Sequence, residues 1–193
     1  MHYLTHNFES VPAAELRRAG LAGLIRADMQ AKGVWYAADG VARSLLHALV
    51  TDGSLCTVLY RLMGALRRWH LRPLAALAYK LNSLLSGAVI GRGARFGPGL
   101  VVLHSVGVVV NSAVRAGRNV IIESGVTIGA EKGGCPSIGD NVFIGSGAKL
   151  IGPIRVGSDV RIGANAVVLE DVPDGATVVG VPAKVVKMRD EEG

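Results

Sequence analysis

Cysteine and aromatic residues are both scarce in this sequence of 193 residues. The two cysteines, Cys56 and Cys135, are too few to form a disulfide framework. Aromatic residues make up only 5% of the chain, whereas 50% is hydrophobic and 26 residues are glycine. Small and β-branched side chains therefore supply most of the apolar content. This composition favours narrow, repetitive packing over a core built around aromatic anchors.

Three features that would indicate another destination or partner are also missing. The first residues do not combine a basic segment with an apolar one, so we expect no secretory signal. No uncharged apolar stretch approaches the ~20 residues that a membrane-spanning helix needs. No run of lysine and arginine is interleaved with aromatic residues, which argues against nucleic acid as a partner. We therefore expect a soluble, cytoplasmic protein.

The positive charge is concentrated in the first part of the chain. Residues 1–86 carry ten lysines or arginines and five acids, whereas residues 87–193 carry eleven and ten. Such an excess attracts phosphorylated ligands and lipid surfaces, so peripheral contact with a membrane is compatible with it. The simpler interpretation is a solvated helix face.

The apolar spacing is helical as far as about Ser86. It predicts helices that begin near Pro12, after Asp39, after the "TDGS" turn and at Pro73. Gly87 is suited to end the last helix in a left-handed conformation. We expect residues 1–87 to form an N-terminal α-helical region.

After Gly87 the apolar period changes to six. The residues of this series are Ile90, Phe96, Val102, Val108, Val114, Val120, Val126, Ile138, Ile144, Leu150, Val156, Ile162 and Val168, with one position skipped at Lys132. An α-helix or a flat strand cannot keep such a repeat in one orientation, whereas a short strand followed by a corner can. The pattern predicts a mainly β solenoid over residues 88–187, with its first and fifth hexad positions inward. Residues 188–193 form a flexible tail in this scheme.

This repeat resembles that of the hexapeptide acyltransferases, whose fold is a left-handed parallel β-helix. The resemblance implies that residues eighteen positions apart stack on neighbouring coils, about 4.8 Å apart. The segment "DVPDGATVVGVPAKVV" (residues 171–186) is similar to the C-terminal signature of that family. Within the family, the chain is most similar to serine acetyltransferases, over roughly residues 40–187.

The segment "LHSVG" corresponds to the "DHATG" or "DHGxG" of serine acetyltransferases, in which the histidine is the general base. The resemblance assigns this role to His104, the only histidine after His70. The chemistry requires such a group, because a hydroxyl is a poor nucleophile at neutral pH and an imidazole can accept its proton.

Three positions depart from the serine acetyltransferase pattern. Leu103 replaces the aspartate before the base, Val89 replaces an acid on the preceding coil, and Cys135 replaces a second active-site histidine. The altered pattern resembles exopolysaccharide acetyltransferases of the colanic-acid type. We therefore expect the hydroxyl of a sugar or exopolysaccharide precursor as acceptor, with serine as the alternative.

Three residues near the base are candidates for further roles. Leu103 and Cys135 are expected to shape the acceptor site. Glu123, nineteen residues after His104, is the nearest acidic candidate to orient the base. Cys135 as an acyl-carrying nucleophile is less favoured, because the repeat has no second histidine to activate it.

The resemblance also implies acetyl-CoA as co-substrate, bound between neighbouring subunits. The residues assigned to it are Ala130, Ser146 and Ala164 along the pantetheine, Lys184 or Lys187 at the phosphates, and the backbone amide near Gly129 at the thioester carbonyl. We expect a homotrimer, with a dimer of trimers left open.

Two other functions use the same fold. A zinc-dependent carbonic anhydrase needs three histidine ligands for each metal, and the repeat contains only His104, so we expect no metal. A non-catalytic scaffold is the remaining alternative, which the presence of His104 disfavours.

Overall fold

The computed structural model describes residues 20–38, 51–131 and 133–189. Within these ranges the helices are α2 (Leu21–Ala38), α4 (Ser54–Arg68) and α5 (Arg72–Ser86). The predicted helices near Pro12 and after Asp39 lie outside the described residues. Pro73 stands in the first turn of α5, and Gly87 ends it in the left-handed conformation with φ 66°. None of the described helices is long and apolar enough to cross a membrane.

The strands that follow are short and form three parallel sheets. Sheet A contains β1 (Val89–Ile90), β4 (Val109–Val110), β7 (Thr127–Gly129), β10 (Lys149–Ile151) and β13 (Val167–Val168). Sheet B contains β2 (Arg95–Phe96), β5 (Arg115–Ala116), β8 (Ser137–Ile138) and β11 (Arg155–Val156). Sheet C contains β3 (Val101–Val102), β6 (Ile121–Ile122), β9 (Phe143–Ile144), β12 (Arg161–Ile162), β14 (Ala176–Val179) and β15 (Lys184–Met188), the last of which is antiparallel to β14.

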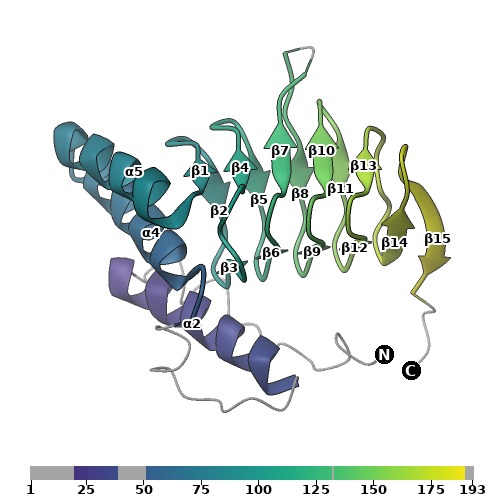
Figure 1. Cartoon of the computed structure of the whole chain (residues 1–193), viewed down its shortest axis with the longest axis horizontal. Coiled ribbons are helices and arrows are strands. Elements are labelled where there is room, and N and C mark those ends of the chain that lie inside the picture. The colour runs from purple at the N-terminus through teal and green to yellow at the C-terminus, as the bar shows by residue number, and fades with distance from the viewer. Residues whose placement is uncertain (1–19, 39–50, 132, 190–193) are drawn as a thin grey trace.

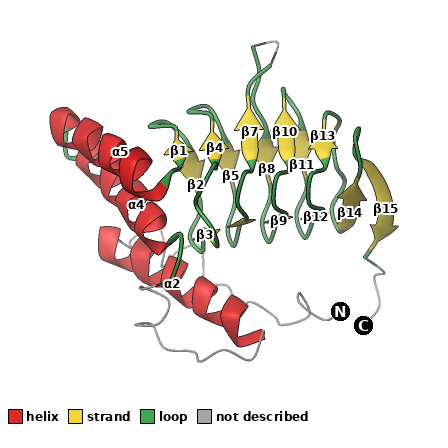
Figure 2. Cartoon of the chain, viewed as in Figure 1, coloured by secondary structure: helices red, strands yellow, loops and turns green. Residues whose placement is uncertain are grey.

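Because the chain visits the three sheets in turn, each set of three strands closes one triangular coil. About four such turns stack into a left-handed β-helix, which confirms the predicted fold. Figures 1 and 2 show the helices gathered at the end of the solenoid where the first coil begins. We name the column of corners between sheet C and sheet A the C–A edge; it comprises residues 103–108, 123–126, 145–148 and 163–166. The A–B edge is the corresponding column between sheets A and B; its described residues are 91–94, 111–114, 130–131, 133–136 and 152–154.

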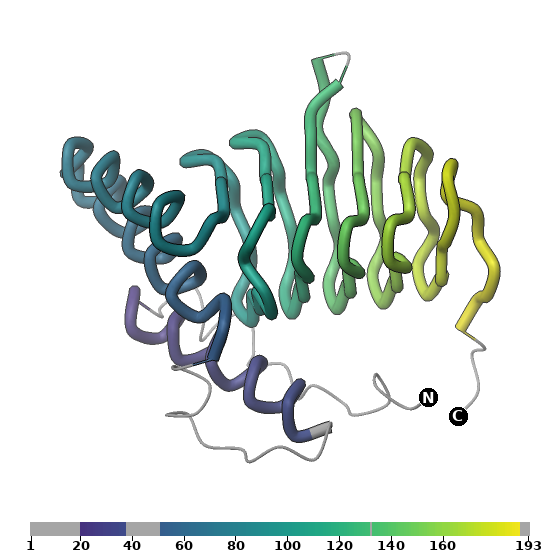
Figure 3. The backbone as a smooth tube through the Cα atoms, viewed as in Figure 1, coloured from purple at the N-terminus to yellow at the C-terminus, as the bar shows by residue number. Residues whose placement is uncertain are grey.

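The predicted spacing of eighteen residues between stacked positions is wrong in two places. Val89 pairs with Val109 twenty residues on, so two extra residues lie between β3 and β4. Arg115 pairs with Ser137 twenty-two residues on, so four extra residues lie between β7 and β8. The loop between β7 and β8 projects beyond the other corners in Figure 3.

These two insertions explain why the sequence series showed no change of phase. The inward positions of each hexad are the first and the fifth, and the fifth position comes two residues before the first position of the next hexad. After an insertion of two residues, the residues of the series therefore occupy fifth positions instead of first positions. Val108 and Val126 are fully buried as predicted, but they occupy fifth positions, just before β4 and β7. The first positions that follow are taken by Val110 and Ile128, within those strands. The insertions of two and four together equal one hexad, so the series resumes in phase at Ile138.

A column of amide and carboxylate side chains stabilises the corners between sheets B and C. Asn119, Asn141 and Asp159 adopt the left-handed conformation there, with φ of 53°, 57° and 58°. Asn119 donates to Asn141 Oδ1 at 3.0 Å, and Asn141 donates to Asp159 Oδ1 at 3.3 Å. Asparagine and aspartate tolerate this backbone better than other side chains do, and here each also supports the next coil.

The helix α2 covers the outer face of sheet C. Ala31 packs in a cluster with Val101, Leu103 and Ile121. Trp35 of the same helix stacks on the ring of Phe143, with centroids 5.3 Å apart. The first three coils of sheet C are therefore shielded on this side, which fixes α2 against the solenoid.

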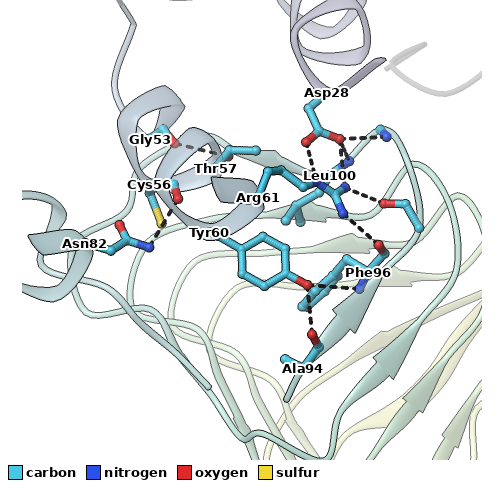
Figure 4. A network of polar contacts seen from close by, with 12 residues as sticks. Asp28, Gly53, Cys56, Thr57, Tyr60, Arg61, Asn82, Ala94, Phe96 and Leu100 are labelled. Carbon is cyan, nitrogen blue, oxygen red and sulfur yellow. Dashed lines mark hydrogen bonds and ion pairs between the residues drawn. The ribbon is translucent and has the colours of Figure 1, made fainter. Parts of the chain in front are cut away.

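A buried ion pair joins the helices to the first coil (Figure 4). Asp28 of α2 accepts bonds from Arg61 of α4 at 2.7 and 2.9 Å. The same carboxylate accepts the backbone N–H groups of Gly99 and Leu100, both at 2.9 Å. Arg61 also donates to the carbonyl of Phe96 at 2.8 Å. Both charges are thus paired and hydrogen-bonded, as burial requires.

Candidate active site

The first of the two insertions carries His104. This residue lies on the C–A edge between β3 and β4, and its side chain is 57% exposed. Its neighbours Leu103 and Ser105 are buried. Leu103 packs under α2, and Ser105 donates from Oγ to the carbonyl of Ser86 at 2.7 Å. Two anchored neighbours therefore hold an outward-facing imidazole.

A carboxylate lies beside this imidazole, and sequence reasoning did not identify it. Oδ2 of Asp52 is 3.4 Å from Nδ1 of His104. Asp52 belongs to the turn that precedes α4, so it comes from the helical region and not from the repeat. With a proton on Nδ1 facing the carboxylate, the lone pair of the imidazole is on Nε2, where it can accept a proton from a hydroxyl.

The turn that carries Asp52 is fixed against α2 and the first coil. Lys32 of α2 donates from Nζ to the carbonyl of Asp52, and to Oγ of Ser54 at 2.8 Å. Gly53 adopts a left-handed φ of 77° and lies so close to Val102 that an added Cβ would be 2.1 Å from its carbonyl oxygen. Burial lowers the pKa of Lys32 from 10.5 to about 8, against the opposing effect of Asp52.

A turn signal in the sequence marks the position of Asp52 but not its partner. The segment "TDGS" separates two helical patterns and indicates a turn. The contact with His104 depends on how α2 and α4 dock on the solenoid. Val89, where the family pattern would place an acid, is a half-buried residue of β1.

Three of the predicted site residues lie on the C–A edge with His104. Glu123, Ser146 and Ala164 follow β6, β9 and β12, on successively later coils. Oγ of Ser146 lies 3.4 Å from Oε2 of Glu123. The predicted role of Glu123 in orienting the base stays a prediction, since the carboxylate in ion-pair distance of His104 is that of Asp52.

The other predicted residues lie elsewhere on the chain. Gly129 is the last residue of β7, and Ala130 and Cys135 lie in the loop that follows it at the A–B edge, before β8. Lys184 and Lys187 are exposed on β15, where Lys184 pairs with Glu170 at 3.2 Å. One chain alone therefore does not bring these residues to His104.

Burial raises the pKa of the Cys135 thiol, which lowers the fraction of thiolate available for nucleophilic attack.

Among the residues that the structure describes, no group of three or more histidine, cysteine, aspartate or glutamate side chains has an arrangement suited to a metal ion.

Comparisons with known proteins agree with this fold. Residues 135–170 match the family "Bacterial transferase hexapeptide (six repeats)". The chain is 42% identical over 153 residues to the serine acetyltransferase of Helicobacter pylori, covering 77% of this chain and 90% of that protein. It is 41% identical over 154 residues to the serine acetyltransferase of Staphylococcus epidermidis, covering 77% of this chain and 72% of that protein.

Solved structures give the same result. A serine acetyltransferase from Neisseria gonorrhoeae in complex with serine matches with a TM-score of 0.77 and 36% identity, over 86% of this chain and 69% of that one. A serine acetyltransferase in complex with CoA matches with a TM-score of 0.78 and 32% identity, over 86% of this chain and 69% of that one.

These similarities overturn the predicted acceptor. A sugar or exopolysaccharide hydroxyl is wrong as the main interpretation, and closeness to exopolysaccharide acetyltransferases is not supported, because relatives with 40% to 42% identity are serine acetyltransferases. The prediction relied on two acids and a histidine of the family pattern, which are replaced here by Leu103, Val89 and Cys135. Asp52 is a carboxylate close to His104 that comes from outside the solenoid. The chain belongs to the serine acetyltransferase family, whose members are acyltransferases that use acetyl-CoA.

Proposed function

We propose that this protein transfers the acetyl group of acetyl-CoA to the hydroxyl of L-serine. The observation that carries the proposal is the 42% identity to a serine acetyltransferase, 90% of whose length is covered. The exposed His104 on the C–A edge supports it, because a hydroxyl acceptor needs a base at an accessible position.

His104 performs the proton transfers in this proposal. Nε2 accepts the proton of the serine hydroxyl as that oxygen attacks the thioester carbonyl. The tetrahedral intermediate then collapses to O-acetylserine, and His104 returns the proton to the departing thiolate of CoA. The reaction is direct, so no acyl group is carried by Cys135.

The C–A edge offers a path for the pantetheine chain. The small residues Ser146 and Ala164 stand eighteen positions apart and stack on neighbouring coils, as the register Phe143 to Arg161 requires. Small side chains allow a narrow chain to lie against the solenoid. We assign the same role to Ala130, with the amide near Gly129 facing the thioester carbonyl.

A homotrimer brings the remaining residues to the site. The C–A and A–B edges border opposite sides of sheet A, so a neighbouring copy must supply the loop with Cys135 if it is to face His104. Leu103 is covered by α2 within one chain, so its contact with the acceptor remains a prediction. Lys184 or Lys187 is assigned to the CoA phosphates on the same basis.

A dimer of trimers is the larger assembly that we keep open. The helix α5 exposes a set of leucine side chains, namely Leu74, Leu77, Leu81, Leu84 and Leu85. An apolar stripe of this kind is suited to a subunit interface. Light scattering of the purified protein distinguishes three copies from six.

The test is the release of CoA from acetyl-CoA by the purified protein with L-serine. The variant His104→Ala should lower kcat/KM by about 10²–10⁴-fold, the usual contribution of a general base. His70→Asn is the matched control, because His70 is an exposed histidine in the turn between α4 and α5 and asparagine tolerates its left-handed φ of 61°.

Two results would contradict the proposal. One is equal turnover of serine by the wild type and His104→Ala. The other is a wild type that binds acetyl-CoA, seen by calorimetry, and yet does not acetylate serine at any concentration.

A further inference from the structure

We propose that Asp52 is the positioning residue for His104, and that the helical region supplies it in place of the acid that the solenoid lacks at Val89. Oδ2 of Asp52 lies 3.4 Å from Nδ1 of His104. The inference rests on the proposed function only in taking His104 as the base. It makes the turn before α4 a part of the active site.

The backbone of Asp52 is held firmly although its side chain is 81% exposed. Lys32 binds the carbonyl of Asp52 and the hydroxyl of Ser54, and both Lys32 and Ser54 are 1% exposed. Gly53 lies directly against the carbonyl of Val102. An aspartate has only two side-chain torsions, so a fixed backbone restricts its carboxylate to a small region beside His104.

The imidazole is held by the same part of the molecule. Ser105 is bonded to the carbonyl of Ser86 at the end of α5, and Leu103 is buried under α2. The carboxylate and the imidazole are therefore both positioned by the docking of the helices on the first coil.

The carboxylate determines which ring nitrogen carries the proton. It favours the tautomer with the proton on Nδ1, which leaves Nε2 free to act as the base. Free histidine in water prefers the opposite tautomer, so without the carboxylate a smaller fraction of His104 is competent. The separation of 3.4 Å exceeds a hydrogen bond, and such contacts commonly shorten when substrate binds.

Glu123 lies on the C–A edge itself, and its contacts point away from His104. Its Oε2 lies 3.4 Å from Oγ of Ser146, on the coil beyond. The backbone of Leu103 bonds to the carbonyl of Ile122, which places Glu123 one coil away from the insertion that carries His104. The geometry thus favours Asp52 as the orienting acid.

The first test reads the tautomer directly and needs no substrate. In the full-length protein labelled with ¹⁵N-histidine, the nitrogen shifts of neutral His104 should show mainly the Nδ1–H form, with the resonance assigned by its loss in His104→Gln. Asp52→Asn should move the population toward the Nε2–H form. Asp159→Asn is the matched control, because it removes a carboxylate that pairs with Arg189 on a different edge of the solenoid.

The second test is kinetic. Asp52→Asn should lower kcat for serine acetylation by about tenfold while the KM for serine changes by less than about twofold, because positioning acts on the reacting state. Asp52→Glu should recover part of the lost rate, since it restores the charge. Asp159→Asn should leave both constants unchanged.

The outcomes separate this inference from the proposed function. An unchanged tautomer in Asp52→Asn overturns the inference, and so does a rise in KM at constant kcat, which would indicate that Asp52 binds the serine ammonium. A shifted tautomer in a protein that does not acetylate serine supports the inference and overturns the proposed function. Normal serine turnover by Asp52→Asn overturns the inference alone.

Discussion

Two corners of the same edge show how this solenoid acquires a site. The corner after β9, residues 145–148, is regular and carries Ser146. The corner after β3, residues 103–108, has two extra residues and carries His104. Both expose a side chain on the C–A edge, but only the second places a titratable group there.

The two corners are supported in different ways. The backbone at Ser146 is held by the coils on either side, through bonds from Asn165 N at 2.8 Å and from Gly147 N to Ser124 at 2.8 Å. The corner with His104 is held from outside by the helices, through Ser105 and Gly53. The repeat thus provides a rigid edge, and the departure from the repeat allows a second part of the chain to reach it.

Among substitutions that weaken the support of the corner with His104, Arg61→Met is expected to have the largest effect on stability. The substitution leaves the carboxylate of Asp28 buried without its partner, which should lower the free energy of unfolding by about 3–5 kcal/mol. Urea denaturation measures it. Arg155→Met, at an exposed arginine of sheet B, is the control and should change stability by less than about 0.5 kcal/mol.

Hydrogen exchange in Arg61→Met distinguishes the two corners. Amides around Val102 and Val110 should lose protection as the helices loosen, while those around Leu150 keep theirs. Equal loss at both corners would show that the solenoid and the helices unfold as one unit, and that the helices do not support one corner more than the other.

A smaller effect is expected from Gly53→Ala. Its Cβ would overlap the carbonyl of Val102, and φ of 77° is unfavourable for alanine, so the turn must move away from the first coil. We expect a loss of about 1–3 kcal/mol in stability, and a fall in kcat because Asp52 moves with the turn.

Gly133→Ala is the matched control for stability. Gly133 has a similar φ of 76°, but an added Cβ would meet nothing within 4 Å. This variant should therefore lose only the stability that alanine loses in a left-handed backbone conformation, with no steric overlap added. If the two variants lose the same stability, the contact of Gly53 with Val102 is not what fixes the turn.

The last effect concerns the pH dependence of Lys32. Burial lowers the pKa of Lys32 from 10.5 to about 8, so between these values the unfolded chain holds a proton that the folded chain has released. The free energy of unfolding of the wild type should therefore rise with pH in this window, relative to Lys32→Met. Below about pH 8 both states are protonated, and the difference between the two proteins should be constant.

Urea unfolding of both proteins at pH 7 and pH 9.5 tests this dependence. A difference in stability that is the same at both values would show that Lys32 titrates normally in the folded protein. In that case its contacts with Asp52 and Ser54 form without a cost of burial.

Much of the solenoid follows from local patterns in the sequence. A period of six with two inward positions determines the coils, and His104 is conspicuous because it is the only histidine of the repeat. The register does not follow, because residues such as Val108 fit either inward position. The insertions before β4 and β8 were therefore hidden by a series that remained apolar throughout.

The sequence by itself determined the hexapeptide solenoid and the helical region before it, and it singled out His104 as the histidine that we propose as the base, since each depends on a local pattern or a recognisable segment. Only the tertiary structure decided that Asp52 lies beside His104. That contact depends on Asp28, Arg61 and Lys32 docking two helices onto the first coil. Contacts between distant segments depend on the energy of packing and buried polar pairs, which no local pattern reveals.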